Sequence, residues 1–289
     1  MAATPPVVLT IAGFDPSSGA GITADIKTIA AHECYGVSCI TALTVQSTQG
    51  VRRVVGLDPG IIAETLQELA ADVSVEAVHI GMLGNGQVVE VVTNFLMQTQ
   101  PPHVVLDPIL KSSSGSDLLD AAGTQLLLEG LLPLAEVLTP NLDEAGILSG
   151  MAVTNLEQMR EAAARLHSLG AANVVITGGD VTKVEKAIDL LSFTTGRGFE
   201  EEVFKADRQR SNSTHGTGCA FSTALACHLA LGRGLPEAVL LSKVYVSAAI
   251  ANAYPLGRGV GPLHHLYRMS QQRRASTIVS EGEHAHSRS

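Results

Sequence analysis

The sequence predicts an α/β fold in which a mostly parallel sheet is covered by helices on both faces. Short apolar runs alternate with longer helical stretches along most of the 289 residues. Each run has the length of a buried strand and ends in glycine or polar residues. A strand, a helix and another strand in this order form a right-handed crossover between parallel neighbours. We therefore expect one domain over residues 1–268, followed by a polar tail, 269–289, that is expected to be disordered.

The expected strands are short, apolar and rich in β-branched residues. They cover 7–12, 37–45, 77–81, 103–106, 137–139 and 173–177. Helices are expected between them, at 22–34, 58–71, 86–99, 116–129, 141–149 and 154–169, and a last apolar helix runs from Cys219 to Leu231. Asp58 followed by Pro59 is typical of a helix N-cap and first helical position.

Composition excludes several classes of protein. The net charge is −9, no window is rich in Lys and Arg, and there is no Trp, so neither a nucleic-acid partner nor a membrane surface is expected. No segment reaches the roughly 18–20 apolar residues of a membrane span. The cysteines, at 34, 39, 219 and 227, form no CxxC pair, so neither a zinc site nor a disulfide framework is predicted. A cytoplasmic enzyme whose anionic ligand arrives with Mg²⁺ fits these features.

Polar residues follow several of the predicted strands. In open parallel sheets, ligands bind beyond the carboxyl ends of the strands. The residues expected to meet at that edge are Asp15, Gln46, Gly81, Met82, Asp107, Asn141 and Thr177–Gly179. This coincidence is the physical argument for a binding site.

A glycine-rich turn opens the last predicted helix. Gly216, Thr217 and Gly218 precede an unbroken apolar run, and Cys219 falls in its first turn. Unpaired N–H groups and the helix dipole make such a turn an anion site. The alternative is a tight turn with a small buried thiol. No P-loop, complete GxGxxG, HExxH or GxSxG motif is present, so a phosphate site is expected here.

Seven segments, taken in order, resemble the hydroxymethylpyrimidine and phosphomethylpyrimidine kinases of the ribokinase-like superfamily. The resemblance covers residues 7–265, and its segments are GFDPSSGAGITADIKT (13–28), ITALTVQSTQGV (40–51), HIGML (79–83), LDPILKSSSGSDLL (106–119), LTPNLDEA (138–145), THGTGC (214–219) and GVGPLHH (259–265). It implies a three-layer α/β/α fold and a homodimer.

The resemblance also implies the catalytic residues. Gly216, Thr217, Gly218 and Cys219 match the anion hole that holds the transferred phosphoryl group of ATP. Backbone donors suit this task, because phosphoryl transfer depends mostly on positioning and charge stabilisation.

The implied metal element is Asn-x-x-Glu. Asn141 and Glu144 match it, and in the family it organises Mg²⁺ and phosphate. One carboxylate with nucleotide oxygens and waters suits the octahedral preference of this ion. The same two residues are also typical of a capped helix start after Pro140, and the two roles are compatible.

The implied pyrimidine pocket contains Asp25 and Gln46, with Gly13 and Met82 lining it. A side-chain amide can satisfy the adjacent donor and acceptor of an aminopyrimidine. Without the resemblance, Gln46 reads as a residue of a turn at a strand end, and Asp25 as an acid that favours a helix N-terminus.

The nucleotide side departs from the family pattern. The resemblance places Asp107, Asn141, Thr177 and Gly179 near ATP. Many relatives carry Lys at the position of Thr177, so no cation is available there to neutralise phosphate charge. Lys111, which replaces an apolar residue, is a candidate substitute for that charge.

The implied reaction phosphorylates 4-amino-5-hydroxymethyl-2-methylpyrimidine and then its monophosphate, for thiamine diphosphate synthesis. Most of the superfamily has Asp where Cys219 stands. We interpret the thiol as an adaptation to an acceptor that is already anionic. Two alternatives remain: a pyridoxal or pyridoxine kinase of the same superfamily, and a catalytically weak regulatory protein that binds nucleotides.

Overall fold

The computed structural model describes residues 4–112, 115, 117–179, 186–207, 209 and 211–271. Its centre is a nine-stranded sheet in the order β3-β2-β1-β4-β5-β6-β7-β8-β9. All neighbouring pairs from β2 to β7 are parallel, whereas β3, β8 and β9 join antiparallel. The predicted mostly parallel sheet is confirmed.

The strands are β1 (Val7–Phe14), β2 (Tyr35–Ser47), β3 (Gly50–Gly56), β4 (Ala77–Ile80), β5 (His103–Leu106), β6 (Val137–Leu138), β7 (Asn173–Ile176), β8 (Lys186–Thr195) and β9 (Gly198–Asp207). The helices are α1 (Gly21–Ala31), α2 (Pro59–Asp72), α3 (Gly86–Thr99), α4 (Ala121–Leu126), α5 (Leu142–Ser149), α6 (Leu156–Ser168), α7 (Thr217–Ala230) and α8 (Leu235–Ala251). A π-helical turn, Leu127–Leu131, and a 3₁₀ turn, Leu132–Leu134, continue α4.

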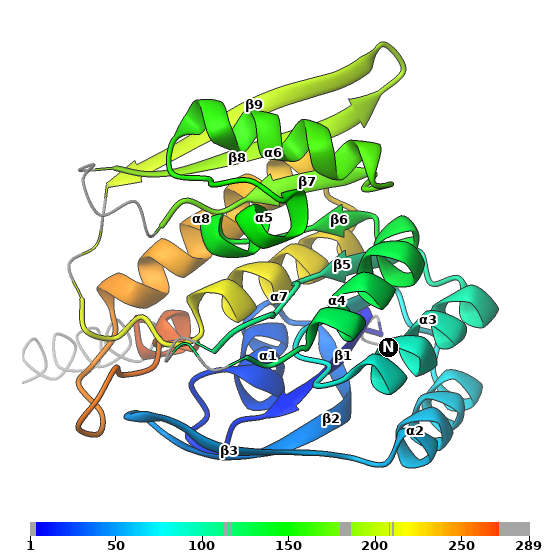
Figure 1. Ribbon diagram of the computed structural model, residues 1–289. Helices are drawn as coiled ribbons and strands as arrows, with labels where there is room; N and C mark the ends of the chain where they lie inside the picture. Colours follow the sequence, from blue (N-terminus) through cyan, green and yellow to red (C-terminus); the bar gives the residue numbers. More distant parts are fainter. Residues whose placement is uncertain are drawn as a thin grey trace, which may run out of the picture.

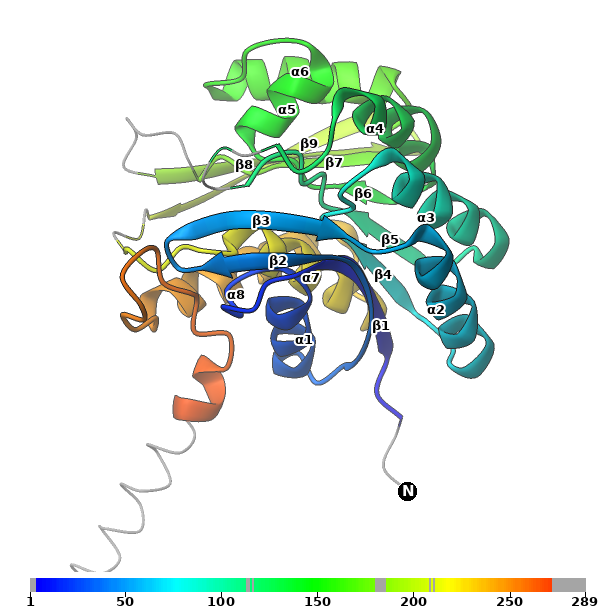
Figure 2. The ribbon, with the colours of Figure 1, turned by 60° about the horizontal axis from the view of Figure 1, so that its bottom comes forward.

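Helices cover both faces of the sheet, as Figures 1 and 2 show. On one face, α2, α3, α5 and α6 bury a core with residues such as Leu66, Val92 and Ala162. On the other face, α1, α7 and α8 bury a second core that includes Ile29 and Tyr245. Since the parallel strands are buried on both faces, strands such as β5 consist largely of buried apolar residues.

Local sequence explains most of the helix starts. The Asp58 side chain accepts a hydrogen bond from Gly60 N at the start of α2, and Asn85 caps α3 through Val88 N. The helix expected at 116–129 begins only at Ala121, because Asp120 caps it by accepting from Gly123 N at 2.7 Å. A cap residue adopts extended backbone, so it sets the helix boundary.

Four elements were not predicted from the sequence. Strands β3 and β9 are largely exposed, so they lack the apolar run of a buried strand. Strand β8 pairs with β9 as a long hairpin. In α8, Leu240 and Val244 are exposed although Val239 and Tyr245 are buried, so its apolar residues do not mark a single face.

Two further observations concern the predicted C-terminal tail and the expected lack of a membrane span. Residues 272–289 of the predicted polar tail lie outside the described residues. Among the helices that the structure describes, none has the length and apolar character needed to cross a membrane.

Candidate functional site

The candidate site lies at the carboxyl edge of the parallel strands, where α7 begins. Asp107 follows β5, and its N–H donates to Ile80 O of β4 at 2.8 Å. Thr177 follows β7, and its N–H donates to Pro140 O at 3.0 Å, which sets Thr177 beside Asn141. The Ser222 hydroxyl of α7 donates to Asp107 Oδ2 at 3.0 Å. The strand-end residues therefore lie around the start of α7, as the topology requires.

The glycine turn at the start of α7 has the geometry of an anion site. Gly216 is the N-cap with φ of 81°, a left-handed conformation that favours glycine. A Cβ on Gly216 would lie 1.9 Å from Gly19 O, so the loop after β1 packs directly on this turn. The N–H groups of Gly218 and Cys219 belong to the first helical turn, where no intrahelical acceptor exists. This turn presents donors and the positive end of the helix dipole.

The Gln46 side chain is linked to this turn through His215. Gln46 lies near the end of β2, and its amide is 3.1 Å from His215 Nε2. The same ring nitrogen lies 2.9 Å from Asp15 Oδ2. Burial of Asp15 favours its neutral form, but hydrogen bonds from His215, Ser17 and Ala20 outweigh burial and lower its pKa. Asp15 is thus an ionised carboxylate that holds His215 in place.

The other predicted pocket residues come from β1, from α1 and from the loop after β4. Gly13 and Met82 are in contact, because a Cβ on Gly13 would meet the Met82 Cε at 2.8 Å. Asp25 is fully buried, and its two oxygens accept from Thr10 Oγ1 at 2.7 Å and Thr223 Oγ1 at 3.0 Å. Both oxygens of Asp25 are therefore occupied within the protein, and its direct contact with a substrate stays a prediction.

A buried polar chain connects Asp25 with Asp107. His79 Nδ1 lies 3.5 Å from Asp25 Oδ2, and His79 Nε2 lies 2.9 Å from the Ser222 hydroxyl, which reaches Asp107. Burial disfavours the charged imidazole, but the Asp25 and Asp107 carboxylates outweigh burial and raise the pKa of His79. The two carboxylates thus favour the protonated form of this buried imidazole.

Asn141 and Glu144 form a complete capping box at the start of α5. Glu144 N donates to Asn141 Oδ1, and Asn141 N donates to Glu144 Oε2, each at 2.9 Å. The Glu144 side chain is buried, and burial together with the Asp107 charge raises its pKa to about 8. Burial also raises the pKa of Asp107 to about 6, against the opposing effects of His79 and Ser222. Two buried acids thus interact electrostatically within the site.

Cys219 lies in the first turn of α7, beside these acids. Burial of its thiol raises the pKa well above the ordinary value, and the Asp107, Asp25 and Glu144 carboxylates raise it further. A hydrogen bond from Gly21 N acts in the opposite direction. The thiol of the free protein is therefore held in its protonated form, because burial and the neighbouring carboxylates together outweigh the hydrogen bond from Gly21 N and the partial charge of the helix dipole.

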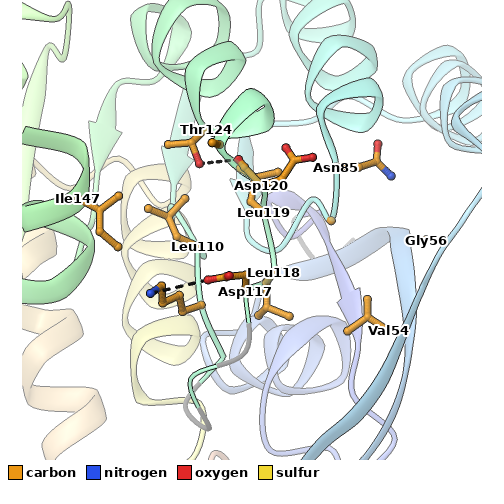
Figure 3. Close-up of a pocket in the computed structure, with 13 residues that line it drawn as sticks. Val54, Gly56, Asn85, Leu110, Asp117, Leu118, Leu119, Asp120, Thr124 and Ile147 are labelled. Carbon is orange, nitrogen blue, oxygen red and sulfur yellow. Dashed lines mark hydrogen bonds and ion pairs between the residues drawn. The ribbon is translucent and has the colours of Figure 1, made fainter. Parts of the chain in front are cut away.

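A cavity of about 680 Å³ adjoins the site but does not contain the predicted residues Gln46 or Cys219 (Figure 3). It lies between Val54 of β3, residues of the stretches 110–111 and 117–124, and Ile147 of α5. Leu110 joins it to the acidic cluster, because its N–H donates to Glu144. Lys111 is half exposed and pairs with Asp117 at 3.7 Å, so its role toward phosphate stays a prediction.

Three residues of this site were not predicted. His79 interrupts the apolar strand β4, and a polar residue inside a four-residue buried strand is a sequence signal that points to it. His215 lies within the THGTGC segment, directly before the predicted anion turn. Ser222 lies inside an apolar helix, and only the packing of α7 against β4 and β5 reveals its partners.

Comparison with known proteins identifies the family. Residues 15–264 match the family model described as phosphomethylpyrimidine kinase. This chain belongs to that family. It is 40% identical to a hydroxymethylpyrimidine/phosphomethylpyrimidine kinase of Streptomyces coelicolor, over 93% of this chain and 97% of the relative. It is 42% identical to the thiamine biosynthesis bifunctional protein ThiED of Geobacter sulfurreducens, over 90% of this chain but 52% of that longer protein.

Solved structures confirm the ribokinase-like fold. The ADP complex of Bacillus subtilis pyridoxal kinase superimposes with a TM-score of 0.83 at 36% identity, covering 92% of this chain and 100% of that chain. The chain is therefore a kinase, a phosphotransferase of the ribokinase-like fold. Because relatives of both pyrimidine and pyridoxal kinase type are similar to it, the choice of substrate depends on the pocket.

Proposed function

We propose that this kinase transfers the γ-phosphoryl group of Mg·ATP to the hydroxymethyl oxygen of 4-amino-5-hydroxymethyl-2-methylpyrimidine, and then phosphorylates the monophosphate again. The observation that carries the proposal is the bond between Gln46 and His215, the residue directly before the anion turn. The Gln46 amide, which can pair with an aminopyrimidine, therefore lies next to the turn whose N–H groups can bind a phosphoryl group.

The residues of the turn bind and orient the transferred group. The N–H groups of Gly218 and Cys219 point toward one place, and Gly216 and Thr217 shape the turn that aims them. These donors are fixed before the reaction, so they stabilise charge on the phosphoryl oxygens without reorganisation. Thr177 and Gly179, after β7, are proposed to line the nucleotide side of the same edge, next to Asn141.

The residues present fit Mg²⁺. Glu144 is a buried acid whose pKa is raised by burial and by Asp107, so a divalent cation would restore its charged form. Over the described ranges, no three His, Cys, Asp or Glu side chains make a metal cage. A site with one or two carboxylates, nucleotide oxygens and water is what Mg²⁺ prefers. Glu144, Asn141 and Asp107 would hold the ion, which neutralises phosphate charge when bound.

A neutral Cys219 is compatible with an anionic second acceptor. The raised pKa keeps the thiol uncharged near neutral pH. A carboxylate at this position would repel a phosphate monoester by about 4 kcal/mol per unit charge, at roughly 4 Å and an effective dielectric near 20. We therefore expect Cys219→Asp to slow the second transfer more than the first, as measured by single-turnover kinetics with each acceptor. Equal losses in both transfers contradict this explanation.

One assay distinguishes the possible functions. ADP release is measured with the pyrimidine alcohol, its monophosphate and pyridoxal, each offered alone with Mg·ATP. The proposal expects turnover with both pyrimidines. The similarity to pyridoxal kinase favours pyridoxal as the second candidate substrate. Preferred turnover of pyridoxal supports that candidate, and absence of turnover with all three supports a regulatory nucleotide-binding protein.

We further propose a cytoplasmic homodimer. The outer face of the β2–β3 ribbon exposes Leu43, Val45 and Val55, with Leu43 directly opposite Val55. An apolar patch on an exposed ribbon is a typical interface between copies. All four cysteines are unpaired thiols, which suits a reducing compartment. Sedimentation equilibrium should report twice the 30.1 kDa chain mass, and a monomer at micromolar concentration contradicts the dimer.

A further inference from the structure

The amide of Gln46 is held at both ends by neighbouring side chains. One end lies 3.1 Å from His215 Nε2, and the other lies 3.2 Å from the Thr44 hydroxyl. The two ends of an amide have nearly the same shape, so the hydrogen bonds around them decide which is oxygen and which is nitrogen. The orientation of this amide decides which hydrogen-bonding pattern Gln46 shows to a ligand.

Asp15 decides the proton on His215. Its Oδ2 receives the N–H groups of Gly19 at 3.2 Å and Ala20 at 3.0 Å, and its Oδ1 receives Ser17, so the group is a carboxylate surrounded by donors. His215 Nε2 lies 2.9 Å from the same Oδ2, and an acceptor there would face a negative charge. Nε2 therefore carries a hydrogen and has no lone pair for a Gln46 N–H.

The single hydrogen of His215 Nε2 points to the Asp15 carboxylate and can be shared with Gln46, so the end of the amide that faces His215 is the oxygen. The opposite end agrees with this assignment. The single hydrogen of the Thr44 hydroxyl goes to Phe14 O at 2.9 Å. The Thr44 oxygen is then an acceptor, and the Gln46 NH₂ group donates to it. With this orientation each of the two contacts of the Gln46 amide pairs a donor with an acceptor, whereas the reverse orientation opposes two donors at His215 and two acceptors at Thr44.

The His215 ring cannot easily change its position. It lies against Gly19, where an added Cβ would come within 2.2 Å of the ring Cδ2. The His215 side chain is only 13% exposed and that of Asp15 only 4%. The donor is thus packed and desolvated, which strengthens its preference for one amide orientation.

We propose that His215, held by Asp15, and Thr44 fix the orientation of the Gln46 amide, so that the pocket offers an acceptor on the His215 side and a donor on the Thr44 side. These are positioning residues for substrate selection, and the proposal rests on the proposed pyrimidine kinase function. A 4-aminopyrimidine presents an amine donor beside a ring-nitrogen acceptor and matches this pattern. A 4-oxo pyrimidine presents an acceptor beside an N–H donor, and the fixed amide rejects it.

The test measures dissociation constants by calorimetry for the aminopyrimidine alcohol and its 4-oxo analogue, without nucleotide. His215→Met removes the donor at similar length, and His215→Gln replaces the Nε2–H with an NH₂ group that can donate to Asp15 and to Gln46. We expect the preference for the amino compound to fall roughly tenfold in the Met variant, because its Gln46 amide can rotate, and to be restored in the Gln variant. The kcat with the aminopyrimidine should change less than its KM.

Thr44→Val tests the other end independently, and we expect the same direction of change. Circular dichroism and thermal unfolding verify that each variant is folded, and if one is not, the remaining variants still decide. An unchanged preference in folded His215→Met and Thr44→Val proteins overturns this inference while leaving the kinase function intact. If the wild-type protein neither binds nor phosphorylates the aminopyrimidine, the proposed function and the inference both fail.

Discussion

The fold lowers the pKa of one buried acid in this site, Asp15, and raises the pKa of two others, Glu144 and Asp107. Asp15, in the loop after β1, accepts hydrogen bonds from Ser17, Gly19, Ala20 and His215, and its pKa is lowered despite burial. Glu144, at the start of α5, is buried near Asp107, and its pKa is raised to about 8. Both acids accept hydrogen bonds from backbone N–H groups. Asp15 also has an imidazole donor, whereas Glu144 has none among the described residues and its pKa is raised by the Asp107 carboxylate.

The difference separates a structural charge from a functional one. Asp15 has all the donors that it needs, so its charge stabilises the folded protein and fixes the pocket. Glu144 and Asp107 are acids whose charged forms cost free energy until a cation binds. Raised pKa values of this kind are concentrated at functional sites. Asp15 is electrostatically satisfied within the protein, whereas the proposed metal site at Glu144 and Asp107 would be completed by its ligand.

The largest expected effect concerns activity on the metal side. Glu144→Gln keeps the side-chain oxygen that accepts from Asn141 N but removes the charge that would hold Mg²⁺. We expect kcat/KM to fall by roughly 100-fold or more, since electrostatic groups of this kind contribute about that much. Steady-state kinetics over a range of Mg²⁺ concentrations measure this loss. Activity within a few-fold of wild type would show that Glu144 has no part in metal binding.

The second effect concerns stability on the pocket side. Asp15→Asn removes the negative charge that accepts from Gly19 N, Ala20 N and His215. If the new NH₂ group takes the place of Oδ2, these donors lose their acceptor altogether. We expect the free energy of unfolding to fall by about 3 kcal/mol, because buried donors lose their acceptor. Urea unfolding measures it. Ser17→Ala is the matched control and should cost about 1 kcal/mol or less, since the Ser17 N–H still reaches Asp15. Equal costs contradict the role given to Asp15.

The third effect is a pH dependence of opposite sign to that of Asp15. The pKa of Glu144 is about 8 in the folded protein against an ordinary value of 4.5, so the folded protein retains a proton that the unfolded chain loses in this window. Stability therefore declines as pH rises from 4.5 to about 8. Glu144→Gln should gain on the order of 4 kcal/mol relative to wild type over that window, at about 1.4 kcal/mol per pKa unit. The free energies of unfolding of both proteins are measured in urea at several pH values. If their difference is the same at pH 5 and at pH 8.5, the pKa of Glu144 is not raised.

The smallest effect is the reactivity of Cys219. Its raised pKa predicts that alkylation by iodoacetamide at pH 7.5 is slower than that of glutathione, by roughly tenfold, because the thiolate is the nucleophile. Mass spectrometry of the labelled peptide measures the rate, and Cys219→Ala assigns the signal. Alkylation faster than that of glutathione would show that Cys219 is a thiolate and would contradict its raised pKa.

Much of the fold was predictable from local patterns. Helix α3 at Gly86–Thr99 and strand β5 at His103–Leu106 have the predicted bounds, because a cap residue or a buried apolar run marks each boundary. The hairpin of β8 and β9 was not predicted, since exposed strands lack an apolar run and β9 is stabilised by pairing with β8. Pairing partners are distant in sequence, so composition alone does not reveal them.

The site divides in the same manner. The sequence by itself determined the glycine turn at Gly216, the capping pair Asn141 and Glu144, and the order of polar residues after the strands, because each depends on neighbours within a few residues. Only the tertiary structure decided that Asp15 fixes the proton on His215 and that three carboxylates keep Cys219 protonated. Hydrogen bonds and charge interactions act through space, so residues 200 positions apart, such as Asp15 and His215, decide each other's state.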